Sequence, residues 1–228
     1  MGNMILGNTN TKFKVGGNDC SIYLGTILLY SGGTQPRLPS GYTEVEYVQN
    51  TGTSYINTEV CLDTSNFEIG YVINDKPQLF GYCRQGCGAC TWLGAEQSAT
   101  MWWGDFNNNA DIASYLTTGE NVITFTPSGA TVNGNSISKT LRIGSNDISN
   151  IPLYIFSRYD LKNNTVEYRD DSYMQLKSFY IKNGGTLVRD FVPAKRNSDN
   201  KYGMYDLVTS TFYLSPNGND FSGGEPIQ

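Results

Sequence analysis

The stretch LVRDFVPAKRNSDNKYGMYDLVTSTFYLSPNGNDFSGGEP, residues Leu187–Pro226, decides the fold class of this chain. Apolar residues recur along its first part, from Leu187 to Val192, and Pro193 follows them. Proline has no backbone N–H to give to a β-ladder, so we expect a strand that ends at Pro193. The stretch therefore begins with an extended segment.

A hairpin is expected in the second half of the same stretch. Tyr202–Asp206 and Thr211–Leu214 flank a connection of four residues, 207–210, which suits two antiparallel strands joined by a short turn. The side chains of Asp206 and Ser210 can bond the backbone of such a turn. We expect the charged residues of this region to support turns and sheet edges, and the region predicts a β-fold built from hairpins.

Two segments carry a resemblance to a known family. They are the motif PAKR-x-SD-x-x-x-GMYD at Pro193–Asp206 and the segment LPSGYTEVEYVQNTGTSYINT at Leu38–Thr58. Together they resemble the concanavalin A-like, laminin-G-like jelly-roll modules of gut-bacteriophage virion proteins and of surface proteins of gut bacteria. The resemblance implies an all-β, antiparallel two-sheet jelly-roll sandwich of the lectin and glucanase type. It also implies carbohydrate binding or a display and attachment role, although a fold does not determine a function.

The composition agrees with an all-β class. The chain has 228 residues, of which 25 are glycine, 16 are tyrosine and only 16% are charged, a balance typical of short strands and tight turns. Such a length suits one sandwich domain with an appendage. The formal net charge of −5 argues against nucleic acid as a partner, because phosphates attract basic surfaces. No apolar run approaches the roughly 20 residues that span a bilayer, so we expect no membrane insertion.

The N-terminal part differs from the rest in pattern. Residues 1–33 form a small β-rich arm, and Ser31–Pro36 is a Gly/Pro linker with few groups to bury. We expect a docking arm with its linker at residues 1–36 and the jelly-roll domain at residues 37–228. In the alternative, the arm adds strands to the edge of the sandwich. The start of the chain lacks the pattern of a secretory signal.

Further strands are expected within the domain. Val122–Phe125, Ala130–Val132 and Ser136–Ser138 read as a meander, with Asn133-Gly134 at its second turn. Asn-Gly is typical of a type I′ turn, which needs positive φ at both central positions. Leu153–Phe156 and Met174–Lys182 are also expected to be strands.

The five cysteines form an odd count, which fits folding in a reducing compartment. Cys83, Cys87 and Cys90 lie in one glycine-rich loop, and three states stay open for them: zinc completed by Cys61 or Cys20, a disulfide within the loop, or free thiols. The spacing lacks the two separated pairs of a four-cysteine zinc knuckle. We therefore assign no metal and no other cofactor.

The chain contains no histidine, which removes the Ser-His-Asp and Cys-His nucleophile arrangements. The Glu-x-Asp-x-Glu pattern of jelly-roll glucanases is also absent from the sequence. The nearest acidic groups are Glu44 with Glu46, which we place on a solvated edge, and Glu167 with Asp170 and Asp171, whose charges we expect to pair locally. No catalytic residue is assigned, and we expect a protein that is not an enzyme.

The tryptophans mark the candidate ligand site. Indoles stack on the C–H faces of sugars, while amides and carboxylates bond the hydroxyls. Adjacent strand residues point to opposite faces, so one of two neighbouring indoles should face outward. Packing of the indoles in the core is the alternative, and calcium is not assigned because the glycine and the glutamate of an EF loop are missing. The candidate glycan contacts are Trp92, Trp102, Trp103, Asp105, Asn107 and Asn109.

The function expected from these observations is a non-enzymatic structural component of a tailed-phage virion. The arm would dock on other virion proteins, and the lectin-like domain would face outward to adhere to a host glycan. The resemblance places it on the outer surface of the virion as capsid decoration, head fibre or tail fibre, made in the host bacterial cytoplasm. A homo-oligomer is expected, because avidity strengthens weak single sites. A carbohydrate-active enzyme of the same fold and a bacterial surface adhesin fragment stay as alternatives.

Overall fold

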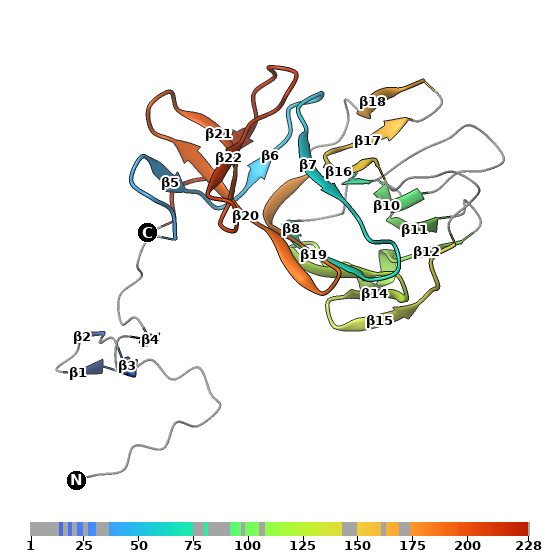
Figure 1. Ribbon diagram of the computed structural model, residues 1–228, viewed down its shortest axis with the longest axis horizontal. Coiled ribbons are helices and arrows are strands. Elements are labelled where there is room, and N and C mark those ends of the chain that lie inside the picture. The colour runs from blue at the N-terminus through green and yellow to red at the C-terminus, as the bar shows by residue number, and fades with distance from the viewer. Residues whose placement is uncertain are drawn as a thin grey trace, which may run out of the picture. The chain divides into compact units, whose positions relative to one another are not determined.

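A computed structural model describes residues 37–74, 99–104, 108–142, 150–160, 163–168 and 174–227, and the strand backbones at 14–15, 18–19, 22–24, 27–30, 80–81 and 92–96 (Figure 1). The chain divides into two compact units, Met1–Arg37 and Leu38–Gln228. In the first unit, β1 (Lys14–Val15) pairs with β2 (Asn18–Asp19), and β3 (Ile22–Leu24) pairs with β4 (Ile27–Tyr30). A docking role for this unit stays a prediction.

The larger sheet has eleven antiparallel strands among the described residues. In order, its main path is β15 (Asn135–Ser138), β14 (Gly129–Val132), β13 (Glu120–Thr126), β8 (Phe67–Asn74), β19 (Gln175–Asn183), β20 (Thr186–Arg196), β21 (Lys201–Asp206) and β22 (Thr211–Tyr213). Off this path, β5 (Tyr42–Glu44) pairs with β20, while β6 (Val48–Gln49) pairs with β19 and with β23 (Ser222–Gly223).

The smaller sheet has six strands among the described residues. Its order is β12 (Asn109–Asp111), β11 (Thr100–Gly104), β10 (Trp92–Glu96), β9 (Phe80–Gly81), β16 (Pro152–Ile155) and β7 (Ile56–Cys61). A separate hairpin pairs β17 (Ser157–Asp160) with β18 (Thr165–Tyr168). The one helical element of the described chain is a 3-10 turn, η1 (Ala113–Tyr115), so the expected all-β class is confirmed. No helix in the described part is long and apolar enough to cross a membrane.

The larger of two hydrophobic clusters serves both sheets. Alternate side chains of the larger sheet, such as Tyr71 and Phe125, are buried in the same cluster as Met101, Trp103 and Ile155 of the smaller sheet. Burial of every second residue along a strand is what the two-residue period of a β-strand produces. Each sheet therefore has one face in the core and one face directed away from it.

The meander is confirmed. The strands β13, β14 and β15 pair in sequence, and the turn between the last two has φ of 50° at Asn133 and 81° at Gly134. Both angles lie in the left-handed region, as a type I′ turn requires. The Asn133 side chain also accepts a hydrogen bond from Val122 N at 2.9 Å and donates one to Tyr115 O at 2.9 Å, which ties the turn to neighbouring backbone.

The expected end of a strand at Pro193 is wrong, because β20 continues to Arg196. On one side of β20 the pairing passes from β19, which ends its register at Phe191, to β5, which begins at Ala194. The Pro193 carbonyl accepts a hydrogen bond from Val45 N at 3.1 Å on that side. The N–H and C=O of one strand residue point the same way. The missing N–H of Pro193 therefore lies on the side where β20 changes its partner from β19 to β5. The pairing of β20 with β21 on the other side continues through Pro193.

The expected turn support by Asp206 is confirmed. Asp206 is wholly buried, and its carboxylate accepts hydrogen bonds from Asp190 N at 2.8 Å, Val208 N at 3.1 Å and the Thr209 hydroxyl at 2.6 Å. These bonds hold the connection between β21 and β22 against the preceding strand.

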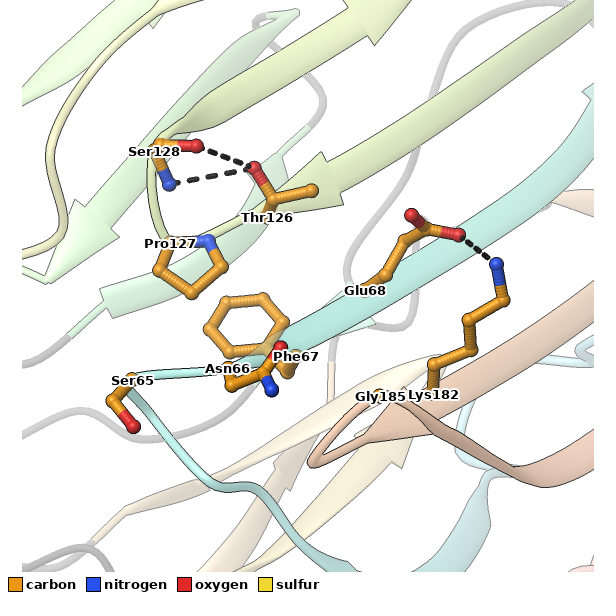
Figure 2. Close-up of a pocket in the computed structure, with 9 residues that line it drawn as sticks. All are labelled: Ser65, Asn66, Phe67, Glu68, Thr126, Pro127, Ser128, Lys182 and Gly185. Carbon is orange, nitrogen blue, oxygen red and sulfur yellow. Dashed lines mark hydrogen bonds and ion pairs between the residues drawn. The ribbon is translucent and has the colours of Figure 1, made fainter.

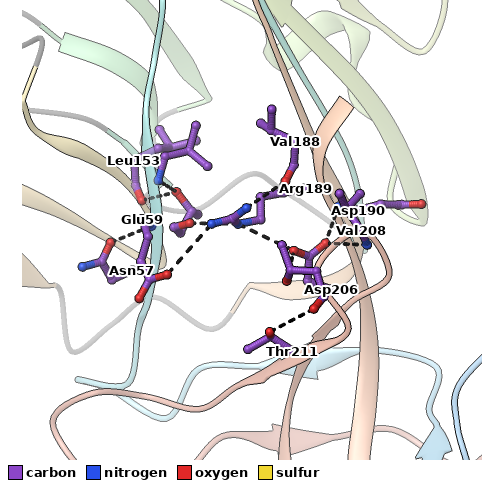
Figure 3. Close-up of polar contacts among 12 residues, drawn as sticks. Asn57, Glu59, Leu153, Val188, Arg189, Asp190, Asp206, Val208 and Thr211 are labelled. Atoms are coloured by element: carbon purple, nitrogen blue, oxygen red, sulfur yellow. Dashed lines mark hydrogen bonds and ion pairs between the residues drawn. The ribbon is translucent and has the colours of Figure 1, made fainter. Parts of the chain in front are cut away.

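Arg189 extends beyond this turn and links the two sheets (Figure 3). From β20 its Nε donates to Thr58 O on β7 at 3.0 Å, and the same nitrogen lies 3.6 Å from Asp206. One terminal nitrogen lies 3.9 Å from Glu59 on β7. Figure 3 draws the guanidinium between Glu59 on one side and Asp206 on the other. The role of Arg189 is therefore to join sheets rather than to support an edge.

Candidate functional site

Trp103 belongs to the core. Its side chain is wholly buried, its ring stacks on Phe125 with centroids 4.9 Å apart, and its Nε1 donates to Thr126 O at 3.2 Å. An indole in this position has no open face for a sugar. We therefore do not carry Trp103 into a ligand site, and the packing alternative describes it.

Trp102 is also buried, although neither of the two hydrophobic clusters of the described residues includes it. It pairs in register with Gly94 on one side and with Asn109 on the other, so two of the expected ligand residues share one row. The row continues through Gly81 to Tyr154. However, Trp102 is only 6% exposed, so its ring offers no open platform.

The rest of the expected site is only partly within the described chain. Trp92 is placed by its backbone alone, opposite Gly104 in the register of β10 and β11. Asp105 and Asn107 lie outside the described residues, as do the three cysteines of the glycine-rich loop. Cys61 is a free, exposed thiol. Within the described residues, no cluster of three or more metal-binding side chains occurs.

Local pairing of Glu167 is confirmed, since its carboxylate accepts a hydrogen bond from Arg158 Nε at 2.6 Å across the hairpin of β17 and β18. Asp170 and Asp171 lie outside the described residues. Glu44 is half-buried at the end of β5, and Glu46, which follows the strand, is exposed. Among the described carboxylates, Glu44, Glu46 and Glu167 line neither of the two cavities described below.

A different polar surface stands out on the larger sheet, on the side away from the core. It consists of polar, outward-facing residues that lie next to one another on five neighbouring strands, and we call it the hydroxyl face. Its members are Glu68, Thr124, Thr126, Thr131, Ser136, Ser138, Tyr180 and Lys182. The residues between them, such as Ile69, Phe125 and Ile181, are buried in the core. The two-residue period thus produces one apolar side and one side rich in hydroxyl groups.

One register row of the hydroxyl face combines a ring with hydroxyls. Tyr180 pairs with Gly70, Gly70 with Thr124, Thr124 with Thr131, and Thr131 with Ser136. A Cβ atom at Gly70 would lie 2.1 Å from Tyr180 Cε1, so the ring occupies the space that a side chain would fill. The absence of a side chain at Gly70 lets the tyrosine ring lie across the neighbouring strand. The result is an aromatic surface beside three hydroxyls.

The charged groups of this face are tied to the same ring. Tyr180 OH donates to Glu68 Oε1 at 2.8 Å, and Lys182 Nζ donates to the same oxygen at 2.7 Å. The bonds from Lys182 and from Tyr180 hold the pKa of Glu68 below its usual range. Burial and then the Glu68 carboxylate raise the pKa of Tyr180, and Glu68 raises the pKa of Lys182. At neutral pH the group is a carboxylate, an ammonium and an uncharged phenol.

Two cavities adjoin the hydroxyl face. The first, of about 350 Å³, lies where three turns meet the sheet and is lined by Ser65–Glu68, Thr126–Ser128, Lys182 and Gly185 (Figure 2). The second, of about 270 Å³, is lined by Thr124, Thr126, Ser128–Thr131 and Ser136–Ser138. They share Thr126 and Ser128. The face is thus hollowed at two adjacent places.

The hydroxyl face was missed from the sequence, although a signal for it exists. Thr124 and Thr126, and again Ser136 and Ser138, are hydroxyl residues two positions apart within expected strands. Period two places such residues on one face. Their alignment with Tyr180 depends on strand pairing, which the sequence does not show.

Comparison of the chain with models of protein families, with curated proteins and with solved structures found no match.

Proposed function

We propose that this chain is a non-enzymatic, glycan-binding component of a tailed-phage virion. In this proposal the two sheets form a lectin-like jelly-roll sandwich, and the hydroxyl face is its binding surface. Residues 1–36 dock on other virion proteins, and the domain is displayed outward for adhesion to a host surface glycan.

The observation that carries the glycan part is the row formed by Tyr180, Gly70, Thr124, Thr131 and Ser136. Sugars expose apolar C–H faces that pack on aromatic rings, and their hydroxyls need partners that both donate and accept hydrogen bonds. A tyrosine ring lying over a glycine supplies the first, and serine and threonine hydroxyls supply the second. Both kinds of group lie in one line across five strands.

The absence of catalysis is supported by the carboxylates of this face. Glycoside hydrolysis requires two carboxyl groups, one of which is protonated at working pH. Among the described lining residues of the two cavities, Glu68 is the one carboxylate. The hydrogen bonds that lower its pKa keep it ionised, which is unsuited to a general acid.

The virion part is supported by the resemblance of residues 38–58 and 193–206 to phage modules. A homo-oligomer fits this role, because several weak sites on one particle act together and raise the overall affinity.

The test is affinity electrophoresis of the full chain in gels that contain surface polysaccharides purified from gut bacteria. We expect retardation by some of them, and we expect Tyr180→Ala to weaken binding about tenfold, as loss of one aromatic contact implies. Tyr180→Phe keeps the ring and should keep most of the binding. Tyr115→Ala, an exposed tyrosine on η1, is the control and should bind as the wild type does.

Two outcomes would overturn the proposal. Equal binding by wild type and Tyr180→Ala, both shown by thermal unfolding to be folded, would remove the hydroxyl face as the site. Release of new reducing ends from any of the polysaccharides would show an enzyme.

A further inference from the structure

The first cavity contains hydrogen-bonding groups that the fold does not use. In the described part of the chain, Glu68 Oε1 accepts from both Tyr180 and Lys182, whereas Oε2 accepts no hydrogen bond. An ammonium group has three donors, and Lys182 uses one of them on Glu68. One acceptor and two donors therefore remain at the same edge of the cavity.

The opposite edge of the cavity is less polar. Figure 2 draws the rings of Phe67 and Pro127 together, away from the Glu68–Lys182 pair. Phe67 is nearly buried and Pro127 is half-buried, so the proline ring forms most of the accessible apolar wall. A ligand in this cavity meets a polar pair on one side and C–H groups on the other.

The volume of the cavity and the charges of its lining residues limit which class of ligand it can bind. A cavity of about 350 Å³ is small for a ligand site, since such sites begin at about 300 Å³. The described lining residues carry one negative and one positive side chain, which are already paired at 2.7 Å. An anionic ligand that accepts from Lys182 would be repelled by the Glu68 carboxylate beside it. The site therefore favours a small uncharged ligand.

We propose that this cavity holds one neutral sugar residue and that the Glu68–Lys182 pair recognises two adjacent hydroxyl groups of that residue. One hydroxyl donates to Glu68 Oε2, and its neighbour accepts from Lys182 Nζ. The C–H face of the sugar packs on Pro127. The inference rests on the proposed glycan-binding function and specifies its ligand as a neutral glycan. The other sugar residues of that glycan bind along the hydroxyl face.

The lowered pKa of Glu68 supports this assignment, because it keeps the acceptor ionised at neutral pH. Hydrogen bonds to a charged acceptor are stronger than those between neutral groups. The bond from Tyr180 also restrains the carboxylate before a ligand binds, so that less side-chain freedom is lost on binding.

The probes are four methyl glycosides: glucoside, mannoside, galactoside and glucuronide. The glucuronide differs from the glucoside only in a carboxylate that replaces the terminal CH₂OH group. Binding to the full chain is measured by saturation-transfer NMR titration. We expect at least one of the three neutral glycosides to bind. We expect the glucuronide to bind about tenfold more weakly than the neutral glycoside that binds.

The variants are Glu68→Gln, Lys182→Met and a matched pair elsewhere on the same sheet. Glu120→Gln and Lys177→Met break an ion pair of 2.5 Å between β13 and β19 that lines neither cavity. We expect Glu68→Gln and Lys182→Met each to weaken binding of the neutral glycoside about tenfold, and we expect the two control variants to bind as the wild type does. Thermal unfolding of all four establishes that they are folded.

The outcomes separate this inference from the proposed function. Suppose that the polysaccharides bind and that Tyr180→Ala weakens their binding. If Glu68→Gln then leaves binding unchanged, or if the glucuronide binds as well as the glucoside, the cavity assignment is wrong and the proposed function stands. The assignment is also wrong if polysaccharides bind and no neutral glycoside does. If neither polysaccharides nor glycosides bind, both are wrong.

Discussion

Arg189 and Asp206 form a polar junction whose strength comes from burial. Asp206 is wholly inaccessible to solvent. The cost of burying its carboxylate is offset by three hydrogen bonds and by the Arg189 guanidinium 3.6 Å away. A buried carboxylate that loses its cation costs several kcal/mol, whereas an exposed ion pair contributes little. Two arginines in the same strand allow the two situations to be compared.

Arg189→Met should destabilise the protein by about 3 kcal/mol, because the Asp206 charge stays buried without its cation and Thr58 O loses a donor. Denaturant-induced unfolding measures the change. Arg196→Met is the matched control: it removes an exposed ion pair with Asp199 of 2.6 Å, and it should shift the unfolding midpoint much less. Equal shifts for the two variants would show that the junction has no special role.

At the level of elements, the pairing of β8 with β19 creates the aromatic platform. Tyr180 and Gly70 are 110 positions apart in the chain, and they face each other only because these strands are neighbours. Glycine in a strand interior weakens the strand, and it is often found where another group approaches closely. Here the group that approaches is the tyrosine ring.

Gly70→Ala should cost about 2 kcal/mol of stability and should weaken glycan binding, because the new methyl group overlaps the Tyr180 ring at 2.1 Å. The double variant Gly70→Ala/Tyr180→Ala should recover part of the stability but not the binding. Gly134→Ala is the comparison: its φ of 81° costs about 1 kcal/mol, but open space surrounds the new atom and binding should be unchanged. Unfolding and affinity electrophoresis give both readouts. A folded Gly70→Ala protein that binds normally would contradict the role of the platform.

For the whole molecule, the hydrophobic clusters of the described residues predict which part of the chain can fold alone. The larger cluster of buried side chains begins at Val45, and the smaller one, around Leu38, Val192 and Tyr205, begins at the first residue of the second unit. Since the described part of Leu38–Gln228 contains both of these clusters, we expect this unit to fold without the arm.

A chain that lacks Met1–Gly33 should therefore unfold cooperatively, with a midpoint close to that of the full chain, and should retain glycan binding. Under the proposed function, it should not be incorporated into phage particles. Calorimetry, affinity electrophoresis and analysis of purified particles measure the three properties. Normal incorporation of the truncated chain would show that the arm is not the anchor, and loss of folding would show that the two units depend on each other.

The sequence by itself determined the local features of this protein. The all-β class follows from its composition, the type I′ turn from Asn133-Gly134, and the β21–β22 hairpin from the spacing around residues 207–210. Each of these depends on residues close in the chain. The missing donor of Pro193 is also a local feature, but β20 continues past it because the strand changes its pairing partner there.

The tertiary structure alone decided which residues share a face. It placed Trp103 in the core and covered Trp102, and it brought Tyr180 onto Gly70 beside the hydroxyls of β13, β14 and β15. The period of a strand predicts which residues share one of its faces, but the order and register of the strands depend on the packing of all of them around one core. A polar face made from five strands therefore appears only when those strands are paired.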